Sequence, residues 1–150
     1  MRMRIGINSG EIVTGNMGSR DRMNYTMMGD SVNLAARLEE AAKQYGIFTQ
    51  ISHFTKKLIT DIDKKFILRE LDTILVVGKS EPVTTFEIMA EASTAAPLLP
   101  TLRDRFHQGL ASYKAQAWDE ATAIFTESLK MENERFPELT KKPNPSKIYL

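Results

Sequence analysis

Residues 25–39 place a short β-prone run directly before a helix-forming run, with a Gly-Asp pair between the two. This order predicts a strand, a sharp turn and a helix. Within the helix, Asn33 and Arg37 are four residues apart and therefore lie on one face. A guanidinium matches phosphate oxygens, and an amide can hold a sugar oxygen or a carbonyl group. The pair at a strand-to-helix junction predicts a nucleotide-binding site.

The helix of this segment has clear start and stop signals. Asp30 or Ser31 can cap its first turn, and the helix is expected to run to about Tyr45 and to end at Gly46. Its apolar stripe is formed by Leu34, Leu38, Ala41 and Ala42. Its polar face is formed by Asn33, Arg37, Glu40 and Gln44.

Several β-prone runs surround this helix. Residues 2–7 and 11–17 flank Asn8-Ser9-Gly10, whose turn chemistry predicts a hairpin. Residues 18–22 read as a polar loop, and residues 25–28 as a short buried strand. Further strands are expected at residues 48–51, 66–71, 74–77 and 83–89, and Ser52 can cap a short helix through about residue 59. Strands and helices are mixed, which predicts an α/β or α+β fold.

The composition changes after residue 90. Ala, Ser, Thr and Pro dominate the next ten residues, which predicts a linker at residues 91–101 between a domain at 1–90 and a helical segment at 102–150. Helical patterns at residues 102–115 and 119–132 predict an α-helical hairpin. Gly109, Trp118, Ala121 and Phe125 have the spacing of a tetratricopeptide repeat, which the hairpin resembles, although Ser112 and Asn133 depart from that pattern.

The overall composition excludes several classes of protein. A net charge of +1 implies no broad basic surface, so no nucleic-acid partner is expected. The chain has no cysteine, which excludes disulfides, thiolate zinc sites and a cysteine nucleophile. No apolar run approaches the ~20 residues that span a bilayer, so this chain is expected to contain no transmembrane segment. These features fit a reducing compartment, and a cytoplasmic location is expected.

Four motifs in order resemble the class III nucleotidyl cyclases, the adenylate and guanylate cyclases. They lie at residues 4–10, 15–19, 25–39 and 78–83, so the resemblance covers roughly the first 90 residues. It implies the C-terminal half of a cyclase catalytic domain, with a partial ferredoxin-like α+β fold. It also implies conversion of ATP to cyclic AMP and pyrophosphate in intracellular signalling, at active sites formed in a head-to-tail homodimer.

The resemblance also implies roles for four residues. Arg37 would stabilise the transition state and Asn33 would hold the ribose. Thr26 stands where adenylate cyclases carry an Asp or Thr that reads adenine and guanylate cyclases usually carry a Cys, which favours ATP as the substrate. Lys79 would contact the phosphates. A P-loop is excluded because Thr73 stands where that motif needs Gly, and a solvated surface Lys is the alternative.

The metal ligands of the family are not among these motifs. Class III cyclases use Mg²⁺ or Mn²⁺ held by two Asp residues, which would precede Met1. No residue of this chain is assigned to a metal, because Asp21 and Asp30 lie in turn motifs and the two histidines lack ligand spacing. This chain would therefore hold only part of the active site and is not expected to be active alone. The alternative is a non-catalytic, cyclase-like remnant that binds a protein partner through its C-terminal helices.

Overall fold

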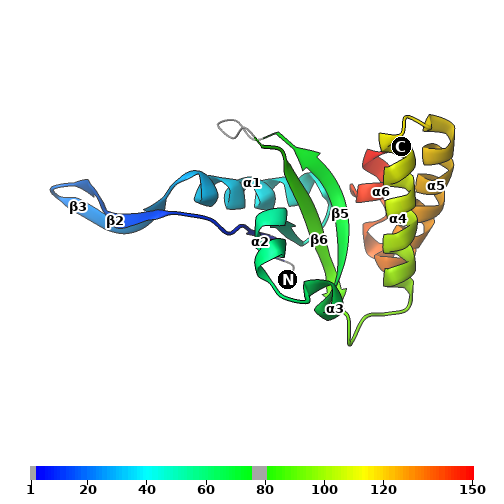
Figure 1. Ribbon diagram of the computed structural model, residues 1–150, viewed down its shortest axis with the longest axis horizontal. Helices are drawn as coiled ribbons and strands as arrows, with labels where there is room; N and C mark the ends of the chain where they lie inside the picture. Colours follow the sequence, from blue (N-terminus) through cyan, green and yellow to red (C-terminus); the bar gives the residue numbers. More distant parts are fainter. Residues whose placement is uncertain (1–2, 76–80) are drawn as a thin grey trace.

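The computed structural model describes residues 3–75 and 81–150. Its centre is a four-stranded sheet in the order β1 (Ile5–Ile7), β4 (Thr49–Ser52), β6 (Val83–Glu91) and β5 (Phe66–Ile74). β1 pairs in parallel with β4, and the other neighbours are antiparallel. Helices lie on the sheet and at one end of it, so the fold is α+β, as the sequence predicts (Figure 1).

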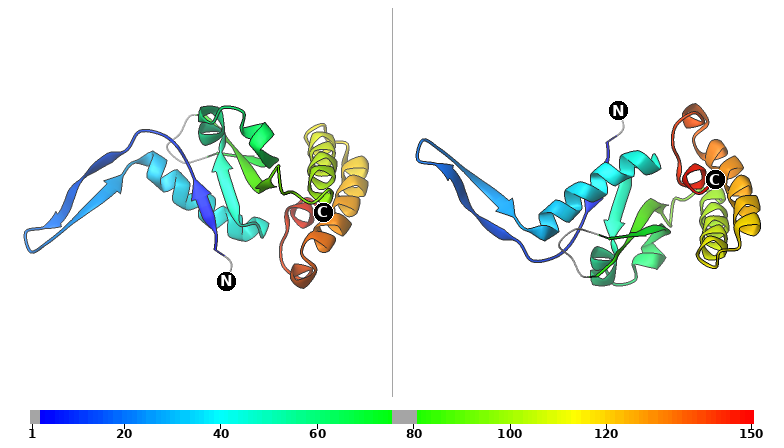
Figure 2. Two further views of the ribbon diagram at one scale, coloured as in Figure 1. Left: turned by 90° about the horizontal axis from the view of Figure 1, so that it is seen from below. Right: turned by 90° about the horizontal axis from the view of Figure 1, so that it is seen from above.

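A two-stranded arm projects from the sheet. β2 (Val13–Ser19) pairs antiparallel with β3 (Arg22–Met28), and Figures 1 and 2 show this ribbon extending away from the rest of the molecule. Every residue of β3 is exposed, because no residue that the structure describes covers either face of the ribbon. The prediction of a buried strand at residues 25–28 is therefore wrong. The expected polar loop at residues 18–22 is only the tight turn at the tip of the arm.

The predicted hairpin between residues 2–7 and 11–17 is also wrong. Asn8 does not turn the chain back; its side chain donates to the Ser31 carbonyl (3.0 Å) and accepts from the Ser52 hydroxyl (2.6 Å). These bonds fix the end of β1 against the first turn of α1 and the end of β4. The strand therefore pairs with β4, more than forty residues away, and β2 pairs with β3 instead.

Helix α1 (Asp30–Tyr45) packs against β1 and β4. Leu34, Leu38 and Ala42 are fully buried, which confirms the predicted stripe, and Gly46 ends the helix in the left-handed conformation, also as predicted. The predicted cap by Asp30 or Ser31 is wrong. Gly29 occupies the cap position with φ 134°, which other residues rarely adopt, and no side chain caps the helix.

Two short helices, α2 (His53–Leu58) and α3 (Ile62–Lys65), follow β4. The Ser52 hydroxyl accepts from the Thr55 amide (3.2 Å), so the predicted cap of α2 is confirmed. Ile62 of α3 packs with Ile51 and Leu68 of the sheet. β5 runs unbroken to Ile74, so the prediction of separate strands at 66–71 and 74–77 is wrong. An irregularity near Leu71 shifts the register of β5 against β6 without ending the strand. Residues 76–77 lie outside the described residues.

The helical tail comprises residues 98–150. It contains α4 (Leu98–Lys114), α5 (Trp118–Arg135), a 3₁₀ turn (Pro137–Leu139) and α6 (Pro145–Ile148). α4 and α5 form the predicted helical hairpin, with Phe106, Leu110, Ala121 and Phe125 packed together. α4 begins at Leu98, so only residues 92–97 connect it to β6. Leu99 and Leu102 pack on Ile67 and Met89, which places the tail directly on the sheet.

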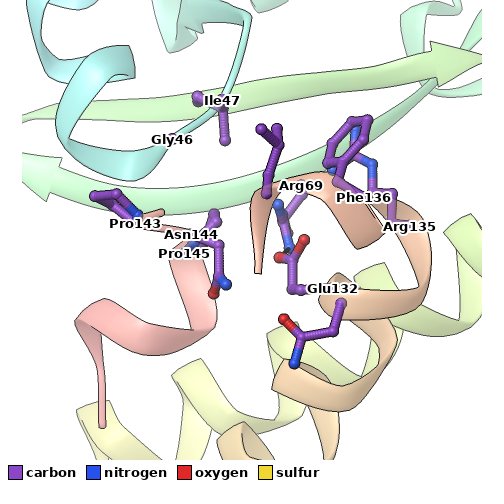
Figure 3. A pocket seen from close by; sticks show the side chains of 11 residues that line it. Gly46, Ile47, Arg69, Glu132, Arg135, Phe136, Pro143, Asn144 and Pro145 are labelled. Carbon is purple, nitrogen blue, oxygen red and sulfur yellow. Dashed lines mark hydrogen bonds and ion pairs between the residues drawn. The ribbon is translucent and has the colours of Figure 1, made fainter. Parts of the chain in front are cut away.

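A buried cluster of four charged residues, called the joint below, holds the tail to the sheet. Arg69 of β5 is fully buried; its Nε donates to Glu87 of β6 (3.0 Å), and its Nη1 pairs with Glu132 of α5 (Figure 3). Arg135 Nη1 donates to the other oxygen of Glu87 (2.8 Å). Burial opposes the charge on Glu87, but Arg69 and Arg135 outweigh it and lower its pKa. The two cations and two anions of the joint thus compensate one another.

Candidate functional site

Asn33 and Arg37 lie one turn apart on the exposed face of α1. Their neighbours Leu34 and Leu38 are fully buried and pack with Val83 of the sheet, which fixes the rotation of the helix. The backbone of α1 also rests closely on β1, because a Cβ atom on Gly6 would lie 2.3 Å from the Ala35 carbonyl oxygen. The amide and the guanidinium are therefore held on a rigid element and face solvent.

Thr26 lies on β3, opposite Gly15 in the arm, and is exposed. Three residues separate it from α1, and Gly29 joins the arm to the helix. Among residues 3–75 and 81–150, the side chains of Thr26, Asn33 and Arg37 make no contact with one another that counts as a hydrogen bond or ion pair. All three side chains are exposed, so their polar atoms are open to a ligand. Lys79 lies outside the described residues.

A hollow of about 270 Å³ opens where the arm meets α1. None of the predicted site residues that the structure describes lines it. Ser31, Val32 and Ala35 lie on one side of α1, whereas Asn33 and Arg37 lie on the opposite side. Its walls are mostly apolar with a few polar groups, which is the usual character of a small-molecule site. The lining residues are Asn8, Gly10, Ile12, Met27, Ser31, Val32 and Ala35.

Asn8 is a residue that the sequence analysis placed only in a turn. It lines the hollow and bridges Ser31 of α1 and Ser52 of β4, while the neighbouring Ser9 hydroxyl bonds the Thr55 hydroxyl (3.1 Å). Its one sequence signal is that an amide can donate and accept at once. The same property also suits Asn to a turn, so the sequence could not distinguish a turn residue from one that bridges α1 and β4.

Residues 3–75 and 81–150 contain neither a metal-ligand cluster nor a membrane-spanning helix. No group of three or more His, Cys, Asp or Glu residues among them lies close enough together to hold a metal ion. None of the described helices is long and apolar enough to cross a bilayer.

Comparison with known proteins identifies relatives of this chain. The family described as the adenylate and guanylate cyclase catalytic domain matches residues 1–90. The terminal-differentiation specific adenylate cyclase of Dictyostelium discoideum is 36% identical over 123 residues, covering 81% of this chain and 6% of that protein. Adenylate cyclase 1 of Rhizobium meliloti is 36% identical over 103 residues, covering 63% of this chain and 15% of that protein.

These relatives are much longer than this chain, which spans less than a fifth of each. The Dictyostelium match covers 81% of the chain, which is more than residues 1–90 can hold, so it also includes part of residues 91–150.

Among solved structures, the adenylyl cyclase CyaB from P. aeruginosa is 36% identical, with a TM-score of 0.49 over 62% of this chain and 45% of that one. The family match covers more than half of the chain. The Dictyostelium and Rhizobium cyclases are each 36% identical to the part of the chain that they match. The chain belongs to the family of adenylate and guanylate cyclase catalytic domains.

Proposed function

We propose that this chain is part of an adenylate cyclase that closes ATP to cyclic AMP and releases pyrophosphate. The observation that carries the proposal is the pair Asn33 and Arg37, held on one exposed face of α1, in a chain of the cyclase family. Two of its relatives carry the name adenylate cyclase. Thr26, whose hydroxyl can accept from the amino group of adenine, favours ATP over GTP.

In this reaction the ribose 3′-oxygen bonds to the α-phosphorus, and the bond from that phosphorus to the bridging oxygen breaks. Negative charge develops on the phosphate oxygens as pyrophosphate leaves. We assign Arg37 to this charge, because a fixed cation that meets it in the transition state lowers the barrier. Asn33 would hold the ribose, Thr26 would read the base, and Lys79 would bind the polyphosphate.

Cyclases of this class use Mg²⁺ or Mn²⁺. The described residues do not fit such an ion, because they offer no cluster of acidic or His ligands. The proposed site is therefore a partial one, made of the groups that contact ribose, base and phosphate.

The remaining wall of the site would come from a second copy in a head-to-tail dimer. Two observations support this arrangement. Asn33 and Arg37 face solvent, and the arm that leads into α1 exposes Tyr25 and Met27 with 72% and 56% of their surface open. A partner seated against the arm would bury this apolar surface.

A second candidate function is protein binding through the helical tail. The observation in its favour is an exposed aromatic pair at the α4–α5 turn, where Tyr113 and Trp118 meet edge to face with ring centroids 5.3 Å apart. Such rings are enriched at protein interfaces. A non-catalytic binder would need this pair and would not need Arg37.

The test is Arg37→Ala in the intact cyclase, assayed for cyclic AMP. Losing a transition-state donor is expected to lower kcat by ~10²–10³ with a much smaller change in KM. Gln44→Ala, on the same polar face two turns further along, is the matched control and should leave both constants unchanged. An unchanged kcat with a raised KM would contradict the role of Arg37, and an intact protein that makes no cyclic AMP would favour the binder.

A further inference from the structure

A pocket of about 210 Å³ lies at the far end of α1 from Asn33 and Arg37. We call it the basic pocket. It is built from three separate segments: the approach to β1, the end of α1 with the start of β4, and the loop after the 3₁₀ turn of the tail. Its lining residues are Arg4, Lys43, Gly46, Phe48, Leu139, Lys142 and Pro143. Every ionisable residue in this lining is a cation.

These cations are not compensated within the part of the chain that the structure describes. The side chains of Arg4, Lys43 and Lys142 form no ion pair there, whereas other surface cations do: Lys114 pairs with Glu70, and Arg105 with Glu127. Glu39 and Glu40 lie one turn before Lys43 on α1 but are not paired with it. Three uncompensated positive charges around one concavity attract anions.

The walls of the basic pocket are formed by close packing. Gly46 and Pro143 touch so closely that a Cβ atom on Gly46 would lie 1.8 Å from the Pro143 carbonyl oxygen, and Figure 3 shows the two residues side by side. Phe48 packs edge to face on Phe136, with ring centroids 5.7 Å apart. Lys147 donates to the Lys142 carbonyl oxygen (3.3 Å), which ties down the loop that carries Lys142.

We propose that the basic pocket binds an anion of the phosphate class. Arg can grip phosphate oxygens with two parallel hydrogen bonds, and Lys adds point charges. The size of the pocket restricts the ligand. Small-molecule sites occupy ~300–1,000 Å³, so this pocket suits phosphate, pyrophosphate or the terminal phosphate group of a larger molecule rather than a whole nucleotide.

This site is distinct from the proposed catalytic one. Asn33 lies ten residues before Lys43 on α1 and Arg37 six residues before it, which correspond to roughly 15 Å and roughly 9 Å of helix. The basic pocket also joins two parts of the chain, because Arg4 and Lys43 belong to the cyclase-family region and Lys142 to the helical tail. A bound anion would therefore link the tail to α1.

The binding test is titration of the protein with phosphate and pyrophosphate at constant ionic strength, followed by calorimetry and by the amide signals of Gly46 and Phe48. Each of Arg4→Gln, Lys43→Gln and Lys142→Gln removes one charge-assisted contact and should weaken binding at least about tenfold. The triple variant should show no saturable binding. Lys141→Gln is the matched control, since it removes a neighbouring charge outside the lining, and should bind as wild type does.

Pyrophosphate is also a product of the proposed reaction, so Arg37→Ala is titrated in parallel. That variant should bind the anion at the basic pocket with unchanged affinity and move the same two amide signals. The proposal is overturned if the pocket variants bind as tightly as wild type, or if Lys141→Gln weakens binding as much as Lys142→Gln. It is also overturned if chloride at matched ionic strength moves the Gly46 and Phe48 signals equally.

Discussion

The arm and the joint reverse the usual distribution of side chains. In the arm, apolar side chains are exposed: Met23 and Tyr25 have 63% and 72% of their surface open. In the joint, charged side chains are buried: Arg69 is 0% and Glu87 1% exposed. Charged residues are almost never fully buried unless paired, and contiguous apolar patches are rarely left open. Each region therefore needs a partner, but among residues 3–75 and 81–150 only the joint finds one.

The joint and the arm differ in whether their interactions are complete within one chain. The joint is complete, because two cations and two carboxylates neutralise one another between the sheet and the tail. The arm is a lone two-stranded ribbon, a structure that is marginally stable in water by itself. We therefore expect substitutions in the joint to change the stability of the single chain, and substitutions in the arm to change its association with another copy.

The largest expected effect is that of Arg69→Met. This substitution leaves Glu87 and Glu132 buried with one cation between them, and breaking a buried ion pair typically costs ~3–5 kcal/mol. The free energy of unfolding, measured by urea denaturation, should fall by that amount. Arg105→Met is the matched control; it breaks the exposed pair with Glu127 and should cost about 1 kcal/mol or less.

A double variant sharpens this test. Arg69→Met with Glu132→Met removes one charge of each sign and leaves Glu87 paired with Arg135. Apolar replacement of a whole buried pair is often neutral. Most of the stability lost in the single variant should return. If the double variant is as unstable as Arg69→Met, shape rather than charge compensation holds the joint.

The next largest effect is expected in the arm. Tyr25→Ser removes an exposed aromatic side chain, so the stability of the single chain should stay within about 0.5 kcal/mol of wild type. If the arm seats a second copy, losing an aromatic anchor typically costs ~2 kcal/mol, which is a roughly thirtyfold weaker dimer. Sedimentation equilibrium of the intact cyclase measures this change. Leu58→Ser, an exposed apolar residue of α2, is the control and should not alter association.

The same contrast shows what the sequence could predict. Local chemistry gave correct predictions for the stripe of α1, its end at Gly46 and the Ser52 cap, because each depends on residues within a few positions. Which strands pair with each other was not predictable from the sequence. β1 joins β4 through Asn8, whose partners Ser31 and Ser52 are distant in the sequence.

The prediction that residues 25–28 are buried was wrong for the same physical reason: burial depends on which distant segments cover a strand. Residues 25–28 are mostly apolar and were expected to be buried, but nothing in the described chain covers the arm. Arg69 and Glu87 are charged but buried, because α5 brings Glu132 and Arg135 over them. In the candidate site, helical spacing placed Asn33 and Arg37 on one face. The basic pocket could not be foreseen, since it needs three segments to meet.

A smaller effect is expected from His107 of α4, beside the joint. Its Nε2 accepts from the Glu70 amide (2.9 Å), which requires the neutral ring. Burial lowers its pKa, assisted by Arg103 and Arg69 and opposed by Glu70 and Asp104. The unfolded chain, with a His pKa of about 6.5, then binds the proton more tightly. Stability contributed by the neutral ring is full above that pH and is lost as the pH falls below it.

Urea denaturation at pH values of about 7.5 and 5.5, on either side of the unfolded pKa, measures this loss. His107→Gln keeps an acceptor for the Glu70 amide but cannot titrate, so its stability should change less between the two pH values than that of wild type. Equal changes in both proteins would mean that other groups carry the pH dependence.

The smallest effect is expected in the connection between the sheet and the tail. Residues 92–97 are mostly exposed and join β6 to α4, whereas Leu99, Leu102 and the joint make the contacts that hold the tail. Doubling this connection with Gly and Ser residues between Thr94 and Ala95 lengthens a loop without removing those contacts. The entropy of closing a loop grows slowly with length, and each doubling costs only about 0.6 kcal/mol. Urea denaturation should therefore show a loss several times smaller than that of Arg69→Met. A loss as large as that of Arg69→Met would mean that the connection, and not the joint, keeps the tail on the sheet.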